Sequence, residues 1–229
     1  MLIALPNLDG SFTCTLFFPF DGAESFSSLK TPSDVTAFFT RVFPDAVPIM
    51  PTLTDDFFHN PTGSLVTVKC FPWIYKDKVS LIGDAAHAIV PFFGQGMNCG
   101  FEDCTVLDEI LDKHKDDWSR ALPEYQLARK PNADAIADLA VQNFIEMRDL
   151  VGKPHFLLRK KIEARIHEKF PDKWLPLYSQ VTFSNIPYSV ALANGKMQDA
   201  IMEEVMAIPG IEERWDSPEV EKQILARIA

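Results

Sequence analysis

Residues 79–104 read Val-Ser-Leu-Ile-Gly-Asp-Ala-Ala-His-Ala-Ile-Val-Pro-Phe-Phe-Gly-Gln-Gly-Met-Asn-Cys-Gly-Phe-Glu-Asp-Cys. The opening is typical of a short buried strand that delivers Asp84 at its carboxyl end, where ligands bind in open α/β sheets. Gly94-Gln95-Gly96 then leads into a helix. Glycines let a ligand approach the backbone closely, and a helix N-terminus offers free N–H groups. A carboxylate beside such a helix start suits a ligand with a polyol chain and an electron-poor ring.

Strand signals dominate the first part of the chain. Residues 2–18 are expected to form a β-hairpin, because two β-rich runs flank the turn signal Asp9-Gly10. Thr31-Pro32-Ser33-Asp34 combines an N-cap residue, a proline at the first helical position and an acid two residues later, which predicts a helix to about residue 43. Residues 66–70 form a further short strand candidate.

Helical signals dominate after Gly96. Apolar residues recur there at spacings of three and four, which predicts an amphipathic helix. Most of the remaining sequence is also expected to be helical. One of these helices is expected to open at Asn132, and the last at Ser217-Pro218. Breaks are expected at Pro123, Pro131, Pro154, Pro171, Pro176, Pro187 and Pro209.

Composition excludes several classes of protein. The 229 residues carry 22 basic and 32 acidic side chains, and a net charge of −10 argues against a nucleic-acid partner. A hydrophobic fraction of 47% excludes a disordered chain. The N-terminus does not resemble a signal peptide, and no apolar stretch predicts a membrane-spanning helix. The four cysteines lack metal-ligand spacing and are expected to be reduced thiols in a cytoplasmic protein.

Several segments carry a resemblance to a known family. Residues 83–87 (Gly-Asp-Ala-Ala-His), residues 91–98 and Phe101-Glu102-Asp103 resemble the second flavin-binding motif of the class A FAD-dependent aromatic hydroxylases. Within that family, residues 91–98 and 142–148 are similar to the enzymes that hydroxylate L-kynurenine. Residues 176–178 and 181–184 carry the same similarity.

The resemblance implies both an architecture and a chemistry. It implies an α/β fold, with residues 1–110 supplying the C-terminal part of an FAD-binding and substrate domain that has an antiparallel substrate sheet. Residues 111–229 are then a mainly α-helical region. The implied reaction is hydroxylation of kynurenine to 3-hydroxykynurenine, with FAD as cofactor, NADPH as reductant and O₂ as the second substrate.

One element of the family pattern is absent from the sequence. The family begins with a Rossmann GxGxxG strand–turn–helix that holds the ADP part of FAD, and the 229 residues contain no such fingerprint. The chain is therefore expected to correspond to the C-terminal half of such an enzyme. We expect it to require the missing N-terminal half as a partner and to be inactive alone.

The resemblance also implies which residues contact ligands. Asp84 would bind the ribityl chain of FAD, and the backbone near Gly96 would face the pyrimidine edge of the isoalloxazine. The expected cofactor-binding residues are Gly83, Asp84, Pro91, Gly94, Gln95, Gly96, Met97 and Asn98. The expected substrate-binding residues are Phe17, Phe92, Phe93, Asn143 and Tyr178. No catalytic side chain and no metal site are expected.

Several of these residues also have a simpler, structural interpretation. Asp84 alone would be a turn or helix cap, and the aromatic residues after Pro91 would be ordinary core. His87 is expected to orient its loop, because no second metal ligand follows at a suitable spacing. Asn143 lies in an otherwise apolar helix row, so it must bond either to backbone or to substrate. The substrate-binding role expected for Phe17 depends on the register of its strand, since a shift by one residue would turn Phe18 toward the ring pocket instead.

Two rival functions stay open. One is a related flavin hydroxylase that acts on another small aromatic acid. The other is a non-catalytic interaction module without affinity for flavin. A basic strip around Arg159-Lys160-Lys161 is expected to be a solvated helix face, with contact to an anionic membrane surface as the alternative.

Overall fold

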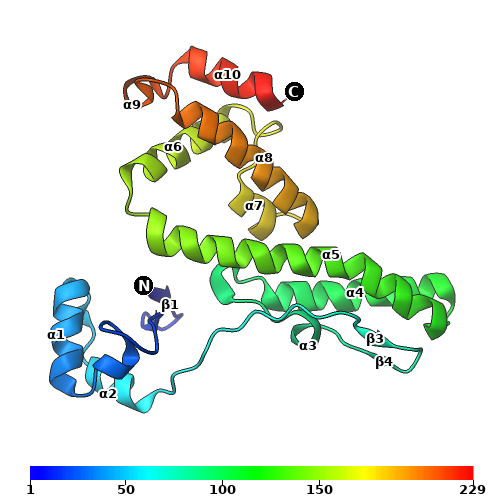
Figure 1. Cartoon of the computed structure of the whole chain (residues 1–229), viewed down its shortest axis with the longest axis horizontal. Coiled ribbons are helices and arrows are strands. Elements are labelled where there is room, and N and C mark those ends of the chain that lie inside the picture. Colours follow the sequence, from blue (N-terminus) through cyan, green and yellow to red (C-terminus); the bar gives the residue numbers. More distant parts are fainter. Residues whose placement is uncertain (229) are drawn as a thin grey trace. The chain divides into compact units, whose positions relative to one another are not determined.

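A computed structural model describes residues 1–228 and divides the chain into two compact units, Met1–Ser64 and Leu65–Ala229. The path of the chain through its helices and strands is drawn in Figure 1. The boundary between the units lies between Ser64 and Leu65, well before residue 110. Residue 110 itself lies inside one helix, α4 (Gly96–His114). The functional division expected at residue 110 stays a prediction.

The first unit opens with the expected hairpin. Strands β1 (Leu2–Pro6) and β2 (Phe12–Leu16) pair antiparallel. Asp9 tightens the turn, since its Oδ1 accepts a 2.9 Å hydrogen bond from the backbone N–H of Ser11. Gly10 adopts a φ of +84°, a conformation that glycine accepts without strain. The hairpin prediction is confirmed, although β2 ends two residues earlier than expected.

Two helices cover the apolar residues of this unit, α1 (Pro32–Val42) and α2 (Leu53–His59). The capping box expected at the start of α1 is present: Thr31 Oγ1 accepts from the Asp34 N–H at 3.2 Å, and Asp34 Oδ2 accepts from the Thr31 N–H at 2.9 Å. Single 3₁₀ turns, η1 (Phe26–Ser28) and η2 (Val47–Ile49), complete the unit. Its core consists of Val35, Phe38, Phe39 and Leu53, with Phe18 among the partly buried residues packed against it.

The strands of the second unit are shorter than the sequence predicts. They are β3 (Ile74–Tyr75) and β4 (Val79–Ser80), paired antiparallel. The prediction of a strand at residues 66–70 is wrong. A strand requires a ladder of backbone hydrogen bonds with a neighbouring strand, and within the described residues this run forms no such ladder. The buried strand expected before Asp84 is also wrong, since Val79 is 54% exposed.

Helices build most of the second unit. The segment that follows β4 contains α3 (Asp84–His87), the 3₁₀ turn η3 (Pro91–Phe93) and α4. Helix α5 (Trp118–Ile145) runs alongside α4 (Figure 1) and continues into a π-helical segment, η4 (Glu146–Leu150). The helix predicted after Gly96 is therefore confirmed.

The expected breaks at Pro123 and Pro131 and the helix start expected at Asn132 are wrong, because all three residues lie inside α5. A proline in a helix interior costs roughly 3 kcal/mol. Helix α5 packs against both α4 and α8 (Tyr188–Met206) and buries ten side chains. This packing offsets the local cost, and the sequence window around each proline does not contain that information.

The other expected breaks agree with the structure. The remaining helices are α6 (Pro154–Lys169), α7 (Leu177–Thr182), α8 (Tyr188–Met206), α9 (Ile211–Arg214) and α10 (Pro218–Ile228). Pro154 begins α6, while Pro176 and Pro187 precede α7 and α8 directly. Ser217 caps α10, because its Oγ accepts from the Val220 N–H at 3.4 Å. The described chain is thus mostly helical with two small antiparallel sheets, which confirms the α/β expectation only in part.

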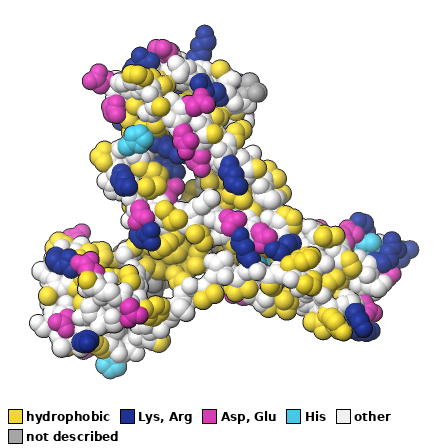
Figure 2. Space-filling view, viewed as in Figure 1, with side chains coloured by type: hydrophobic (Ala, Val, Ile, Leu, Met, Phe, Trp, Pro, Cys, Tyr) yellow, Lys and Arg dark blue, Asp and Glu magenta, His cyan; other side chains and the backbone are white. Residues whose placement is uncertain are grey.

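Two of the three residues of the basic strip pair with acidic side chains of the same chain. Arg159 pairs with Glu163 and Asp199, and Lys160 pairs with Glu146. Acidic and basic side chains lie close together over the visible face of the second unit in Figure 2. These contacts favour the interpretation as a solvated helix face. Separately, none of the helices in residues 1–228 is long and apolar enough to cross a membrane.

Candidate functional site

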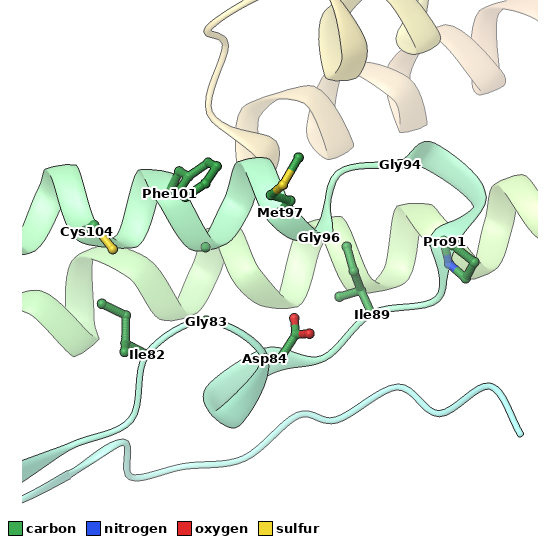
Figure 3. Close-up of a pocket in the computed structure, with 11 residues that line it drawn as sticks. Ile82, Gly83, Asp84, Ile89, Pro91, Gly94, Gly96, Met97, Phe101 and Cys104 are labelled. Carbon is green, nitrogen blue, oxygen red and sulfur yellow. The ribbon is translucent and has the colours of Figure 1, made fainter. Parts of the chain in front are cut away.

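A cavity of about 700 Å³ lies in the second unit, between the segment that follows β4 and the first turns of α4 (Figure 3). Asp84 supplies the one charged side chain among its lining residues. Most of the others are glycine or apolar. The lining consists of Ile82, Gly83, Asp84, Ile89, Pro91, Gly94, Gly96, Met97, Gly100, Phe101 and Cys104.

Asp84 reaches this cavity from the first position of the short helix α3. The preceding Gly83 has φ +60° and ψ −140°, a backbone conformation that favours glycine and turns the chain sharply into α3. The Asp84 carboxylate is exposed and lies on the cavity side of its helix (Figure 3). The acceptor is thus where the sequence predicts it, although a helix start rather than a buried strand supports it.

The opposite wall is the N-terminus of α4. Gly94 ends η3 with φ +67°, and the chain enters the helix at Gly96. The first intrahelical bond runs from the Cys99 N–H to the Gln95 carbonyl at 2.9 Å. The amides of the first turn precede this bond, and such amides have no acceptor within their own helix. They are available to an electron-rich group of a ligand.

The cavity brings together most of the expected cofactor-binding residues. Gly83, Asp84, Pro91, Gly94, Gly96 and Met97 all line it. The side chains of Gln95 and Asn98 instead line a second cavity of about 340 Å³. Gln95 is buried there, and its Oε1 accepts from the Tyr188 hydroxyl at 3.0 Å and from Asn98 Nδ2 at 3.1 Å. Only the backbone of Gln95 and Asn98 can therefore face the first cavity.

Four of the expected substrate-binding residues gather around η3. Phe92 and Phe93 are buried within the turn itself. The Phe92 ring lies 4.5 Å from that of Phe144, and the Phe93 ring stacks on Tyr178 at 5.6 Å between centroids. Asn143 Nδ2 donates a 2.7 Å hydrogen bond to the Phe92 carbonyl. The backbone partner considered for Asn143 is therefore present, and the amide holds the aromatic turn.

Phe17 belongs to the first unit, so its role beside the other four residues stays a prediction. It is half-buried directly after β2, with its N–H donating to the Met1 carbonyl at 2.8 Å. The neighbouring Phe18 packs into the core of that unit, 4.8 Å from the Phe38 ring. Phe18 therefore serves the core in the described structure.

Behind the cavity wall lies a buried charged cluster that the sequence analysis did not identify. Asp103 is fully buried, and its Oδ2 accepts from His87 Nε2 at 2.5 Å while its Oδ1 accepts from Arg129 Nε at 2.6 Å. Cys99 Sγ lies 3.8 Å from His87 Nδ1. One sequence signal could have indicated this cluster. Cys99 and Asp103 are four residues apart, and both are close to His87 in sequence. Arg129 comes from α5 and gave no such signal.

The cluster is held in its charged state. Burial alone would lower the pKa of His87, but its hydrogen bonds to Asp103 and Cys99 outweigh burial and raise that pKa to about 10. Burial alone would raise the pKa of Asp103, but the bonds from His87 and Arg129 hold it below its ordinary value. His87 is thus a buried residue that fixes its loop, as expected.

The same cluster contains three potential metal ligands. His87, Cys99 and Asp103 offer ligand atoms within 4.8 Å of one another. Hydrogen bonds among these three residues and the adjacent Arg129 guanidinium already account for their arrangement.

The first cavity fits a flavin in its chemistry. An exposed carboxylate can accept hydroxyl hydrogen bonds from a polyol chain, and Ile82, Met97 and Phe101 supply apolar contact for a ring system. An added Cβ at Gly94 would meet nothing within 4 Å, and one at Gly96 would meet Ile89 Cγ1 at 3.7 Å. The glycines therefore leave backbone accessible beside the carboxylate.

Comparison with known proteins agrees with this chemistry. Residues 71–140, which contain the cavity, match the family described as FAD binding domain. The chain is 60% identical over 225 residues to kynurenine 3-monooxygenase of Flavobacterium johnsoniae, covering 98% of this chain and 50% of that protein. It is 58% identical over 228 residues to kynurenine 3-monooxygenase of Christiangramia forsetii, covering 100% of this chain and 51% of that protein.

A third relative shows a similar match. The chain is 52% identical over 218 residues to kynurenine 3-monooxygenase of Dictyostelium discoideum, covering 90% of this chain and 47% of that protein. The chain spans about half the length of the curated relatives it matches. It is therefore related to the kynurenine 3-monooxygenases over about half of their length, and its residues 71–140 match the FAD binding domain family.

Proposed function

We propose that this chain is the C-terminal half of an FAD-dependent monooxygenase that converts L-kynurenine to 3-hydroxykynurenine with NADPH and O₂. The observation that carries the proposal is the cavity lined by Asp84 and glycine backbone, inside the segment that matches the FAD-binding family. The extended similarity to kynurenine 3-monooxygenases supports the same substrate.

Asp84 and the start of α4 hold the cofactor. When bound, FAD supplies the oxygen-activating chemistry, and the protein supplies position and electrostatics. Asp84 accepts hydrogen bonds from the ribityl hydroxyls, each charge-assisted and worth about 1.5–3 kcal/mol. The backbone of residues 96–98, at the positive end of the helix dipole, would hold the electron-rich edge of the flavin ring.

The aromatic residues around η3 shape the substrate side. Phe92, Phe93 and Tyr178 exclude water from the reacting groups. Asn143 fixes the turn that carries the two phenylalanines, through its bond to the Phe92 carbonyl. Phe17 is expected to complete the ring pocket. No side chain of this chain is required as a general base.

The rest of the enzyme supplies the dinucleotide part of the site. A Rossmann half that holds the ADP portion of FAD is the expected partner, and with it the two-stranded elements described here become part of a larger α/β fold. Residues 1–110 then belong to the FAD-binding and substrate domain, and residues 111–229 form the helical region. The cytoplasmic location expected from the four thiols stays a prediction.

A chimera tests the proposed function. The half of the Flavobacterium johnsoniae relative that this chain does not cover is fused to the 229 residues, and the product is loaded with FAD. We expect L-kynurenine to stimulate NADPH oxidation and 3-hydroxykynurenine to accumulate. A fusion carrying Asp84→Ala serves as the matched control for flavin content.

Other outcomes identify the rivals. Stimulation by a hydroxybenzoate but not by kynurenine would favour a related hydroxylase with a different aromatic acid as substrate. A folded, colourless chimera that retains no flavin would favour a non-catalytic module.

A further inference from the structure

We propose that Asp103 is a positioning residue that fixes the Gly83 peptide and thereby directs the Asp84 carboxylate into the cavity. The inference deepens the proposed function, because flavin is the ligand toward which Asp84 would be directed. Asp103 itself does not line the cavity, although Gly100 and Cys104 on the same helix do. It must therefore act through the residues that it contacts.

Asp103 connects three parts of the second unit. Its Oδ2 accepts from the Gly83 N–H at 2.9 Å and from His87 Nε2 at 2.5 Å. Its Oδ1 accepts from Arg129 Nε at 2.6 Å. One carboxylate on α4 thus holds the residue before α3, the last residue of α3 and a cation from α5.

Holding Gly83 and His87 fixes Asp84, which lies between them. Helix α3 has only four residues, so it has little stability of its own. Gly83 adopts φ +60°, a conformation close in energy to others for glycine, and needs an external contact to select it. The bond from its N–H to Asp103 supplies that contact. The direction of the Asp84 side chain follows from the orientation of this peptide.

Burial makes the arrangement specific. Asp103 is 0% exposed and Arg129 is 1% exposed. A carboxylate in such a place is tolerated only when cations and hydrogen-bond donors pair with it. The Asp103→Asn variant keeps the shape but removes the charge, and an amide can offer only one acceptor oxygen for donors that now use two. The Gly83 N–H then loses its charged acceptor.

The test uses the 229-residue chain in three forms: wild type, Asp103→Asn and Glu102→Gln. Glu102 is the matched control, because it also pairs with Arg129, at 2.8 Å, from the adjacent position of α4, and it lines the second cavity. The first readout is the Gly83 amide in ¹H–¹⁵N NMR, through its chemical shift and hydrogen exchange. The second is the Kd for FAD of the same three forms in the chimera described above, measured by flavin fluorescence.

We expect Asp103→Asn to shift the Gly83 amide upfield and speed its exchange, and to weaken FAD binding about tenfold or more, as loss of a hydrogen bond to a charged group predicts. Glu102→Gln should leave both readouts close to wild type. A Gly83 amide that is unchanged in Asp103→Asn would overturn the proposal. So would an unchanged FAD Kd accompanied only by a lower Tm, which is the result of a merely structural role.

Two further outcomes remain decisive. If Asp103→Asn does not fold, the Gly83 amide of the wild-type chain tests the proposal. An amide that exchanges as fast as exposed backbone overturns the proposal. A protected, downfield amide supports it. Should the wild-type chimera bind no FAD, the proposed function fails. The Gly83 readout, which needs no flavin, still shows whether Asp103 fixes the peptide.

Discussion

At the scale of single residues, Asp84 combines two properties: it lines the cavity and it is exposed. Asp84→Ala therefore removes an acceptor without opening the core. In the chimera, we expect the Kd for FAD to rise about tenfold or more, since a charge-assisted hydrogen bond is worth roughly 1.5–3 kcal/mol. Fluorescence titration and flavin content after gel filtration measure this. Asp108→Ala, an exposed carboxylate outside the cavity lining, is the control, and equal flavin retention in both variants would refute the role of Asp84.

Asn143 lies on the other side of the site, where its 2.7 Å bond holds the Phe92 carbonyl. Asn143→Ala loses this bond, worth about 1 kcal/mol, and should lower Tm by about 2–4 °C. In the FAD-loaded chimera, we also expect a higher KM for kynurenine with flavin retained, because the aromatic turn shifts. Steady-state kinetics measure KM and kcat separately. The exposed neighbour provides a control, Gln142→Ala. A lower Tm with unchanged kinetics would leave Asn143 with a structural role alone.

The buried cluster makes stability depend on pH. The pKa of His87 rises from 6.5 to about 10 on folding, so its protonation stabilises the folded chain fully below pH 6.5. That contribution is lost as the pH rises toward 10. Asp103 behaves oppositely: its pKa is lowered from 3.8, so its contribution is present above that value and is lost in acid.

His87→Gln isolates the alkaline part of this dependence. The difference in unfolding free energy between wild type and His87→Gln should be largest below pH 6.5 and should shrink toward pH 10. Urea unfolding at a series of pH values measures it. His87 also lowers the pKa of Asp103, but that carboxylate titrates in acid, so between pH 6.5 and 10 the difference reports on His87. A difference that stays constant over this range would contradict a protonated His87.

At the scale of elements, local signals placed the helix ends well. The capping box of α1 is readable from four consecutive residues, because cap and backbone interact within one turn. Thr31→Ala should therefore cost about 1 kcal/mol of stability. Chemical unfolding measures it, with the exposed Ser33→Ala as control. Equal stability of the two variants would show that the cap contributes little.

The element interiors were less predictable. Pro123 and Pro131 lie within α5, although each is locally a helix breaker. The prediction of a strand at residues 66–70 was wrong because it, too, depended on contacts outside the local sequence. A β-rich run becomes a strand only when a partner is positioned beside it, and strand partners are not encoded in the run itself.

At the scale of the molecule, the helical part contains a core of its own. Helices α6, α8, α9 and α10 supply the buried residues Ile162, Ile166, Met202, Ile211 and Ile224, among others. Ile224→Ala on α10 should cost about 2–5 kcal/mol through the cavity that it leaves. We expect the Kd of the chimera for FAD to stay unchanged, because none of these residues lines the cavity that contains Asp84. Leu157→Ala, at an exposed position of α6, is the control. A large loss of FAD affinity in Ile224→Ala would show that the two regions are coupled.

The amino-acid sequence by itself determined the family resemblance, the flavin chemistry expected at residues 83–98, the hairpin and most helix boundaries. These features depend on residues close together in the chain, where type and spacing are visible. Only the tertiary structure decided that Asp103 and Arg129 meet behind Asp84, that Asn143 bonds to the Phe92 carbonyl, and that α5 continues through its prolines. Each of these joins elements distant in sequence, and their energies arise from burial and pairing that exist only once the chain has folded.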